Sequence, residues 1–473
     1  MVSLKLNKKI TFLIILFSGL ILRFYNISFD NLWYDEIISF WVASPKNSYV
    51  ESFNIHNYIE VAPYTYHFIL KIFFKLFGYE VFVGRYMSAI FGVLSILSIS
   101  YIVIILKYKK AYLFSLFLIS FNIFLISYSQ EMRVYSMLLF FISLSFIFFL
   151  KLFNQEKNYI NYMWFIIFSL IAITLHPFAL LIFFSFIFFT FLRFIKKKNV
   201  FKEINASLVI IGILSMLFYF IFFFYLEPSE KQFFWISQIN LKFFTNLFFS
   251  AFFGSRLMGG IFLLVLIYLI FYHKKLLLDL KNPSIFLISI ITSYFLPIIF
   301  SYIIQPVMIP RYFIFVIIPV IILITVLTFE LKSKKKIYFI TFFLCAATII
   351  NMFEEQTFKQ FYSDRIVNKP EYTKTLLFIK KSNHINYTLK VEKNMKSITE
   401  TTNAINNYID YLNKKIDSNL FYLPLEKIGL KPIWIICPMD IQLDCLLPDE
   451  ISDYKVLDEK NFNRINIKLI KKI

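Results

Sequence analysis

The chain has 473 residues, of which 59% are hydrophobic and only 16% are charged, and its mean hydropathy is +0.69. Soluble globular proteins carry about 25% charged residues, so the composition excludes a soluble protein and indicates an integral membrane protein. The net charge of +20 could suggest a nucleic-acid partner, but residues 1–353 hold most of the excess, with 30 Lys and Arg against 13 Asp and Glu. Short basic loops beside membrane spans explain this excess, so we expect no nucleic acid.

Long apolar runs predict a mainly α-helical protein that crosses the membrane about eleven times. A helix needs about 20 apolar residues to cross the hydrocarbon core. The N-terminal run continues through Ile27 without a small-x-small cleavage site, so we interpret it as an uncleaved first span rather than a signal peptide. The spans are expected at 10–29, 85–106, 111–128, 133–150, 159–175, 177–195, 205–226, 257–272, 284–304, 311–331 and 337–353.

The charges between these spans predict the orientation. With a cytoplasmic N-terminus, every obvious basic cluster falls in a cytoplasmic loop, at 107–110, 151–157, 196–202, 273–281 and 332–336. The opposite loops carry most of the acidic residues, as expected when basic residues stay on the cytoplasmic side. We therefore expect a multi-pass protein of the plasma (cell inner) membrane.

Three segments are expected outside the lipid on the external side. The first is the loop 30–84, whose part 63–78 is apolar with two inserted lysines and is typical of an interfacial amphipathic helix. The second is 227–256. The third is the tail, where strand-like runs at 431–439 and 465–470 and a helix around 400–416 predict a small α/β domain. The chain is thus expected to divide into a transmembrane domain, 1–353, and an extracytoplasmic C-terminal domain, 354–473.

Two of the three cysteines, Cys437 and Cys445, lie in this C-terminal domain. An external location permits a disulfide between them, and the sequence leaves open whether they form one. Their spacing, without a His cluster nearby, does not indicate a zinc site.

Ionisable and polar side chains collect at the external ends of the predicted spans, although they come from distant parts of the chain. Such residues at membrane depth commonly line a cavity or pathway. Arg85 and Arg311 could instead extend to lipid headgroups, and His176 could simply end a helix. The adjacent carboxylates Asp35 and Glu36 are harder to explain, because charge near lipid is costly unless water, a cation or a substrate compensates. No Walker, GxGxxG, HExxH or GxSxG motif occurs.

The Asp-Glu pair after the first span resembles the signature of the GT-C glycosyltransferases, in particular the group that contains protein mannosyltransferases and aminoarabinose transferases. Four further segments resemble motifs of that group in the same order: "APYTYHFILKIFFKLFGYEVFVGRYMSAIFG" (62–92), "YSQEMRVYSMLLF" (128–140), "LHPFALL" (175–181) and "PRYFIFVIIP" (310–319). Together these segments cover about residues 10–330. Val61-Ala62-Pro63 stands where the group usually has His-Pro-Pro or Lys-Pro-Pro, so contacts made by that segment are not carried over.

The resemblance implies a GT-C type glycosyltransferase, a hexosyl or pentosyl transferase, that moves a sugar from a polyprenyl-phosphate carrier to an acceptor hydroxyl at the outer face of the membrane. It leaves the sugar open, and the acceptor is a protein, a lipid or a glycan. No cofactor is assigned with certainty, and the sequence does not decide whether a divalent metal is bound. The alternative is a polyprenyl-linked glycan flippase or exporter, which acidic residues at one face, rather than along a midplane pathway, disfavour.

The same resemblance suggests residue roles. Asp35 is the favoured general base, which takes the proton of the acceptor hydroxyl, and Glu36 is the alternative base or a supporting residue. The phosphate leaving group needs cationic partners, and the candidates for these and for the remaining substrate contacts are Arg85, Glu131, Arg133, His176, Arg311 and Tyr312.

Overall fold

The computed structural model describes residues 2–60, 62–154, 158–196, 202–225, 243, 248, 251–354, 367–382, 384–391, 398–424, 430–440, 445 and 454–473. The chain forms two compact units. The first contains residues 1–25, 86–225 and 234–364, and the second contains 26–85, 226–233 and 365–473. Val61 and most of the predicted external segment 227–256 lie outside the described residues.

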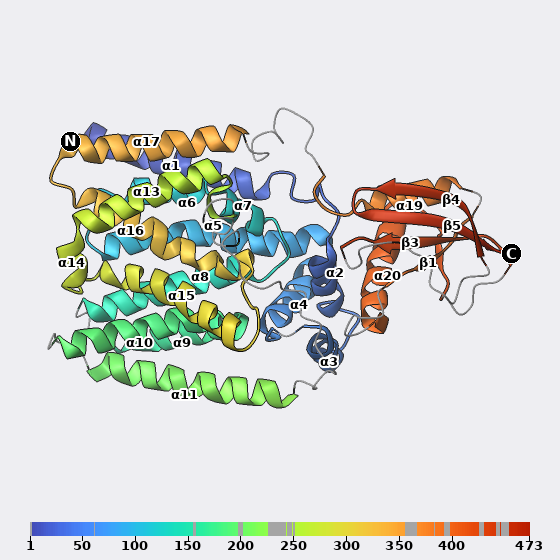
Figure 1. Ribbon diagram of the computed structural model, residues 1–473, viewed down its shortest axis with the longest axis horizontal. Helices are drawn as coiled ribbons and strands as arrows, with labels where there is room; N and C mark the ends of the chain where they lie inside the picture. Colours follow the sequence, from blue (N-terminus) through green and yellow to red (C-terminus); the bar gives the residue numbers. More distant parts are fainter. Residues whose placement is uncertain are drawn as a thin grey trace. The chain divides into compact units, whose positions relative to one another are not determined.

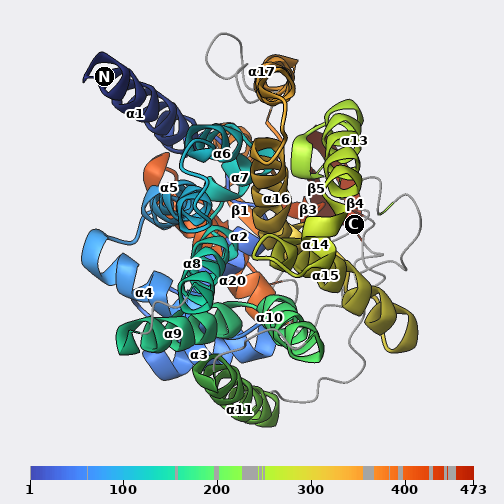
Figure 2. The ribbon, with the colours of Figure 1, turned by 90° about the vertical axis from the view of Figure 1, so that its left-hand side faces the viewer.

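The first unit is a bundle of helices, which Figure 1 shows from the side and Figure 2 nearly end-on. The helices that correspond to the predicted spans are α1 (Val2–Phe24), α5 (Val81–Ile105, which begins in the second unit), α6 (Tyr112–Ser120), α7 (Ile123–Ser129), α8 (Tyr135–Phe153), α9 (Tyr159–Leu175), α10 (Ala179–Ile195), α11 (Lys202–Tyr225), α13 (Arg256–Tyr272), α15 (Ser284–Ile303), η2 (Pro310–Val316) with α16 (Ile317–Phe329), and α17 (Lys334–Glu354). A short helix, α14 (Lys274–Leu278), precedes α15.

The mainly helical, multi-pass prediction agrees with this bundle, but the count of eleven spans is not confirmed. Within the described residues, six helical segments are long and apolar enough to cross a membrane, or seven if the bent pair α6–α7 is one span. Three further apolar helices, α9, α10 and α13, have 17 residues each. At 1.5 Å per residue such a helix is only about 26 Å long, whereas the hydrocarbon core is about 30 Å thick.

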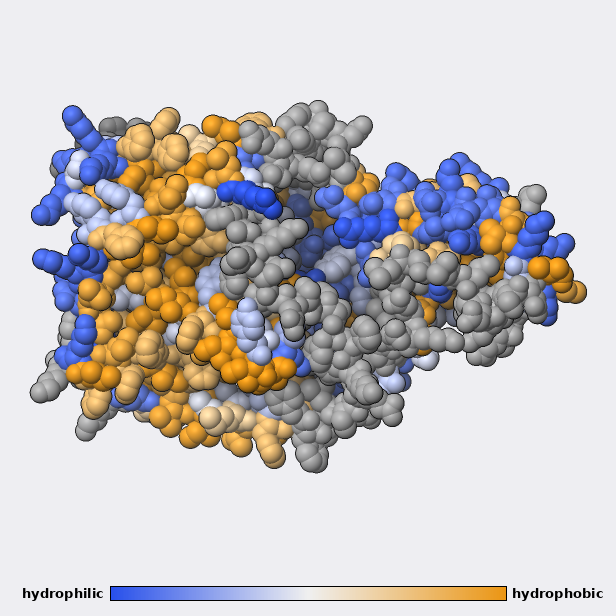
Figure 3. Space-filling model, in the orientation of Figure 1, coloured by the Kyte–Doolittle hydropathy of each residue, from blue (hydrophilic) through white to orange (hydrophobic). Residues whose placement is uncertain are grey.

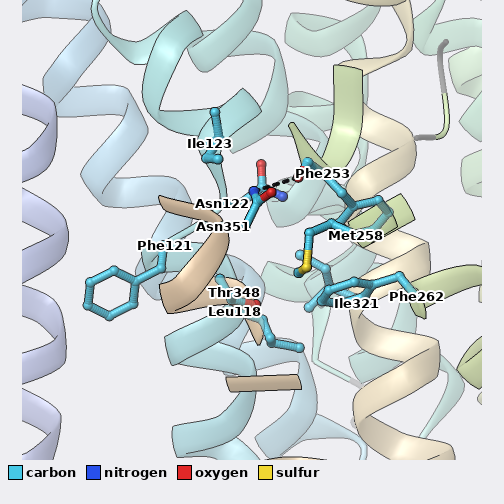
Figure 4. Close-up of a pocket in the computed structure, with 10 residues that line it drawn as sticks. All are labelled: Leu118, Phe121, Asn122, Ile123, Phe253, Met258, Phe262, Ile321, Thr348 and Asn351. Carbon is cyan, nitrogen blue, oxygen red and sulfur yellow. Dashed lines mark hydrogen bonds between the residues drawn. The ribbon is translucent and has the colours of Figure 1, made fainter. Parts of the chain in front are cut away.

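The predicted span 111–128 is broken at Asn122, where α6 and α7 meet at an angle of 58°. The Asn122 side chain accepts a hydrogen bond from the backbone N–H of Leu125 and donates one to the carbonyl of Phe252, both at 2.9 Å. Asn351 of α17 donates to the carbonyl of Phe253 at 2.9 Å, and Figure 4 shows the two asparagines beside a small pocket. These amides satisfy backbone groups inside an apolar bundle, which is the condition for tolerating a broken helix at membrane depth.

The surface of the first unit is largely apolar, as the orange side chains along its helices in Figure 3 show. Large apolar side chains are strongly exposed, among them Phe220 at 73%, Leu264 at 70% and Phe342 at 75%. Soluble proteins rarely expose large continuous apolar surfaces. The bundle therefore supports a multi-pass membrane protein.

The sheet of the second unit contains the C-terminal strands. They are β1 (Asn386–Leu389), β2 (Phe421–Tyr422), β3 (Ile433–Pro438), β4 (Tyr454–Phe462) and β5 (Ile465–Lys472), in the spatial order β2-β1-β3-β5-β4. β1 is parallel to β2 and β3, and β5 is antiparallel to β3 and β4. The helices of this segment are α19 (Tyr372–Lys381) and α20 (Ile398–Lys415).

The α/β prediction for the tail is confirmed in its main elements. The runs 431–439 and 465–470 contain β3 and begin β5, and the helix expected around 400–416 is α20. Cys437 and Cys445 form a disulfide. Whether this segment is an extracytoplasmic domain that begins at residue 354 stays a prediction.

Three helices of the second unit precede α5: α2 (Tyr34–Val42), α3 (Tyr49–Ile59) and α4 (Thr65–Phe77). The predicted helix at 63–78 is therefore present as α4. Its Lys71 is 0% exposed and donates to the carbonyls of Ser44 (2.5 Å) and Asn47 (2.7 Å) and to the hydroxyl of Ser52 (2.8 Å). This lysine therefore holds the α2–α3 connection against α4, which the apolar pattern of the helix did not indicate.

Candidate active site

The predicted carboxylate pair lies in the first turn of α2, with Asp35 and Glu36 directly after the first helical residue. Carboxylates are favourable there because the helix dipole places partial positive charge at the N-terminus. Consecutive residues are separated by about 100° around a helix, so the two side chains point in different directions. Glu36 is 0% exposed, whereas Asp35 is half-buried.

Glu36 forms a buried ion pair with two cations. The Arg85 guanidinium contacts both carboxylate oxygens, from Nε to Oε1 and from Nη2 to Oε2, each at 2.9 Å. The ammonium of Lys369 donates to Oε2 at 2.6 Å. Burial alone would raise the pKa of Glu36, but Arg85 and Lys369 outweigh burial and hold the pKa at about 2. With both oxygens occupied, Glu36 is a poor proton acceptor near neutral pH.

Arg85 uses all five N–H donors of its guanidinium within the second unit. Besides the two bonds to Glu36, Nη1 donates to the carbonyls of Ile27 (2.8 Å) and Asp30 (2.9 Å), and Nη2 donates to that of Asn31 (3.2 Å). The residue is 1% exposed. Arg85 therefore fixes the loop before α2 and has no donor left for a phosphate, which argues against the hypothesis that it binds the carrier phosphate.

The loop before α2 is also bound by helices from the C-terminal part of the chain. The Asn31 side chain accepts from the backbone N–H of Thr373 (2.9 Å) and donates to the Thr373 hydroxyl (2.8 Å). The backbone N–H of Leu32 donates to the phenol oxygen of Tyr408 at 3.0 Å. These contacts place the entry to α2 against α19 and α20. The sequence carries no motif that would have indicated them.

A third acid, Asp440, interacts electrostatically with Asp35. Burial raises the pKa of Asp440, the nearby Arg464 guanidinium opposes this, and the charge of Asp35 adds to the increase. The Asp440 side chain is 9% exposed, and its Oδ1 accepts from Arg464 Nη1 at 3.3 Å. Asp440 follows β3 and was not among the predicted site residues.

The first unit brings together three of the predicted residues. The ring centroids of His176 and Tyr312 are 4.8 Å apart, and the guanidinium of Arg311 lies 5.9 Å from the ring centroid of Tyr312. His176 Nδ1 accepts from the backbone N–H of Phe178 at 3.2 Å, so a neutral His176 carries its proton on Nε2. Residues 176 and 311–312 are far apart in sequence, and the structure places them side by side.

Glu131 and Arg133 occupy the turn between α7 and α8. The backbone N–H of Arg133 donates to the carbonyl of Glu131 at 2.8 Å, and the carbonyl of Arg133 accepts from the Ser88 hydroxyl of α5 at 3.4 Å. The Arg133 side chain is buried and Glu131 is half-buried. The predicted site residues thus belong to two groups, each held within its own unit: Asp35, Glu36 and Arg85 in the second, and Glu131, Arg133, His176, Arg311 and Tyr312 in the first.

Among the described residues, no group of three or more His, Cys, Asp or Glu side chains has the arrangement of a metal site. Burial raises the pKa of Tyr34, beside the carboxylate pair, to about 12, so its phenol stays protonated at neutral pH. The chemistry available around α2 is therefore that of carboxylates, ammonium and guanidinium groups and a neutral phenol.

Neither a protein-family model nor a curated protein sequence matches this chain. Solved structures do match. ArnT from Cupriavidus metallidurans bound to undecaprenyl phosphate is 9% identical with a TM-score of 0.56, and the match covers 97% of each chain. The oligosaccharyltransferase from Archaeoglobus fulgidus in complex with Zn and sulfate is 12% identical with a TM-score of 0.54, over 91% of this chain and 68% of the other. Both neighbours are GT-C glycosyltransferases, and at these identities the likeness is one of fold. The chain therefore has the fold of the GT-C glycosyltransferases, as its sequence motifs indicated.

Proposed function

We propose that this protein is a glycosyltransferase that moves a hexose or pentose from a polyprenyl-phosphate carrier to an acceptor hydroxyl at the outer face of the membrane. The observation that carries the proposal is the unequal state of the carboxylate pair. Glu36 is buried between two cations, whereas Asp35 is half-buried on the same helical turn. The fold adds support, because the ArnT structure with this fold holds undecaprenyl phosphate.

Asp35 is the general base in this proposal. The acceptor oxygen attacks the anomeric carbon, the bond from that carbon to the phosphate oxygen breaks, and the hydroxyl proton passes to the Asp35 carboxylate. Glu36 serves as a fixed neighbour rather than as the base, because its two oxygens are already bound to Arg85 and Lys369.

The leaving polyprenyl phosphate gains negative charge, which cationic donors stabilise. Arg133 and Arg311 are the proposed donors, because Arg85 has its five N–H groups engaged. His176 and Tyr312 add hydrogen-bond donors, and Glu131 orients Arg133 or the acceptor. The apolar surface of the bundle suits the prenyl chain.

This proposal keeps the predicted arrangement in the membrane. The N-terminus is cytoplasmic, residues 1–353 form the transmembrane glycosyltransferase domain with loop 30–84 outside, and residues 354–473 form an extracytoplasmic domain. The acceptor is a protein, a lipid or a glycan of the cell envelope.

The test uses membranes that contain the full-length chain and a panel of undecaprenyl phosphates carrying tritiated mannose, glucose, galactose or arabinose. We expect one donor to yield free undecaprenyl phosphate and a labelled envelope acceptor. Asp35→Asn should lower the rate at least about 100-fold, the lower end of the usual contribution of a general base. The control is Asp417→Asn, since Asp417 is exposed and its φ of 49° suits asparagine.

Two results would contradict the proposal. Turnover at the wild-type rate in Asp35→Asn would remove Asp35 from the role of base. Movement of the labelled lipid across the membrane without cleavage of the sugar–phosphate bond would instead establish a flippase.

A further inference from the structure

We infer that Lys369, from the C-terminal part of the chain, is a positioning residue for Asp35: together with Arg85 it holds Glu36 as a bound anion, so that Asp35 is the member of the pair that exchanges a proton with substrate. This inference rests on the proposed function. It assigns to the C-terminal segment a part in the chemistry, beyond a structural one.

The position of Lys369 is determined by contacts on both ends of the residue. Its ammonium donates to Glu36 Oε2 at 2.6 Å, and its side chain is 15% exposed against 0% for Glu36. Its backbone carbonyl accepts from the side-chain amide of Asn463 at 3.0 Å, and the same amide donates to the carbonyl of Val367 at 2.9 Å. Asn463 lies in the turn between β4 and β5. The sheet therefore fixes the segment from which Lys369 reaches the carboxylate pair.

Two hydrogen bonds between Glu371 and Asn463 also fix the segment that carries Lys369. The backbone N–H of Glu371 donates to the carbonyl of Asn463 at 3.1 Å, and the Glu371 carboxylate accepts from the backbone N–H of Asn463 at 3.1 Å. Lys369 is thus held in a short connection whose backbone is bound to the β4–β5 turn. These bonds fix the backbone from which the Lys369 side chain extends to Glu36.

The charge balance explains why the position of this cation matters. Arg85 and Lys369 place two positive charges on the single negative charge of Glu36, and the Asp30 carboxylate also acts on Arg85. Charges in such a poorly solvated place act on one another more strongly than in water. Removing the Lys369 charge makes the surroundings of Asp35 more negative, and this favours its protonated form.

Other titratable groups around the pair do not replace this cation. Burial raises the pKa of both Tyr34 and Tyr408, so these phenols are neutral. Three acids also act on this cluster, namely Asp30, Glu60 and Asp440, and the Arg464 guanidinium forms an ion pair with Asp440. Of the two cations bound to Glu36, Arg85 cannot be removed without releasing the loop that it holds, so Lys369 is the one whose charge can be tested.

The experiment compares the full-length wild type with Lys369→Met, Lys369→Gln and Lys369→Arg. The first readout is labelling of Asp35 by dicyclohexylcarbodiimide, which reacts with protonated carboxyl groups, followed by peptide mass spectrometry across a pH series. The second is the pH profile of sugar transfer. Both neutral variants should move the labelling midpoint of Asp35 and the acid limb of the profile upward by about half a pH unit or more. Lys369→Arg should restore both. In the neutral variants, kcat should fall on the acid limb while the KM for the donor stays unchanged.

The matched control is Lys374→Met, because Lys374 of α19 forms an ion pair with Glu371, the residue directly before that helix, but its side chain is 66% exposed. It should behave as the wild type does in both readouts. Unchanged Asp35 midpoints in both neutral Lys369 variants would overturn the inference, even if transfer continues. Absence of transfer in the wild type would refute the proposed function. Because the labelling needs no activity, the Asp35 midpoints would still decide whether Lys369 controls the ionisation of Asp35.

Discussion

Replacing Glu36 with glutamine should destabilise the protein by an amount that depends on pH. Glu36→Gln keeps the size of the side chain but removes the negative charge between Arg85 and Lys369. The buried Arg85 and the partly buried Lys369 then face each other without an anion, and removing one partner of a buried ion pair is strongly destabilising. The change therefore tests whether this buried cluster stabilises the fold.

The magnitude follows from the pKa of Glu36, which lies at about 2 in the folded protein against an ordinary value of 4.5. Each pH unit of difference corresponds to about 1.4 kcal/mol, so the ionised carboxylate contributes about 3 kcal/mol at neutral pH. Because the folded pKa is the lower one, this stabilisation is complete above about pH 4.5 and is lost as the pH falls toward about 2. At about pH 3, roughly 2 kcal/mol of it should be gone.

The assay is the thermal midpoint of the detergent-solubilised protein, read as the fraction that remains monodisperse after heating, at about pH 7 and about pH 3. A loss of about 3 kcal/mol should lower the midpoint by roughly 6–12 °C for a unit of this size, and the gap between wild type and Glu36→Gln should narrow at the lower pH. Glu459→Gln is the control, because Glu459 faces Lys468 at 3.9 Å with its side chain 44% exposed. Such surface pairs contribute about 0–1 kcal/mol.

Two outcomes would refute this reasoning. Equal midpoints for wild type and Glu36→Gln at neutral pH would mean that desolvation of the three charges cancels their attraction. A gap of the same size at both pH values would mean that the loss comes from altered packing and has no connection to the ionisation of Glu36.

Two further substitutions test the packing of each unit. Gly92→Ala should lower the thermal midpoint of the protein by an amount corresponding to about 1–3 kcal/mol, because an added Cβ would lie 2.6 Å from the Cβ of Ser129. Gly260→Ala, with no atom within 4 Å of the added carbon, should leave the midpoint unchanged or raise it slightly, because alanine is the better helix former in α13. Lys71→Met should cost about 2–3 kcal/mol by the same assay, since it leaves three oxygen acceptors of a buried ammonium without their donor, whereas Lys75→Met on the exposed face of α4 should have little effect. Equal midpoints within either pair of variants would contradict the corresponding packing argument.

Periodic features of the structure were predictable from the sequence. Apolar runs indicated the helices of the bundle, and alternating or continuous apolar residues indicated β3 and β5. β4 was not anticipated, because its sequence YKVLDEKNF is charged and most of the strand is exposed. The count of eleven spans is not confirmed, because α9, α10 and α13 have 17 residues each and hydropathy measures apolar character without showing where a helix ends.

The site was predictable only in its residue types. Asp35 and Glu36 stood out because two carboxylates beside a span are costly, but their different surroundings were not visible. An arginine at the start of an apolar run looks like a phosphate or headgroup ligand, and the actual partners of Arg85 are backbone carbonyls of a turn together with Glu36, which lies 49 positions away. Lys369 is 333 positions from Glu36 and lies in no motif, so only the folded chain reveals it.

The hydrogen bonds of the loop before α2 have a consequence for engineering this protein. Asn31, Leu32 and Glu36 take partners from residues 369–408, so the loop with the first turn of α2 and the C-terminal segment are matched to each other. A chimera that receives only segment 365–473 from a relative would lose these contacts. A chimera that receives only segment 26–85 would lose them as well. Recombination between relatives should therefore preserve function when segments 26–85 and 365–473 are inherited together as one cassette.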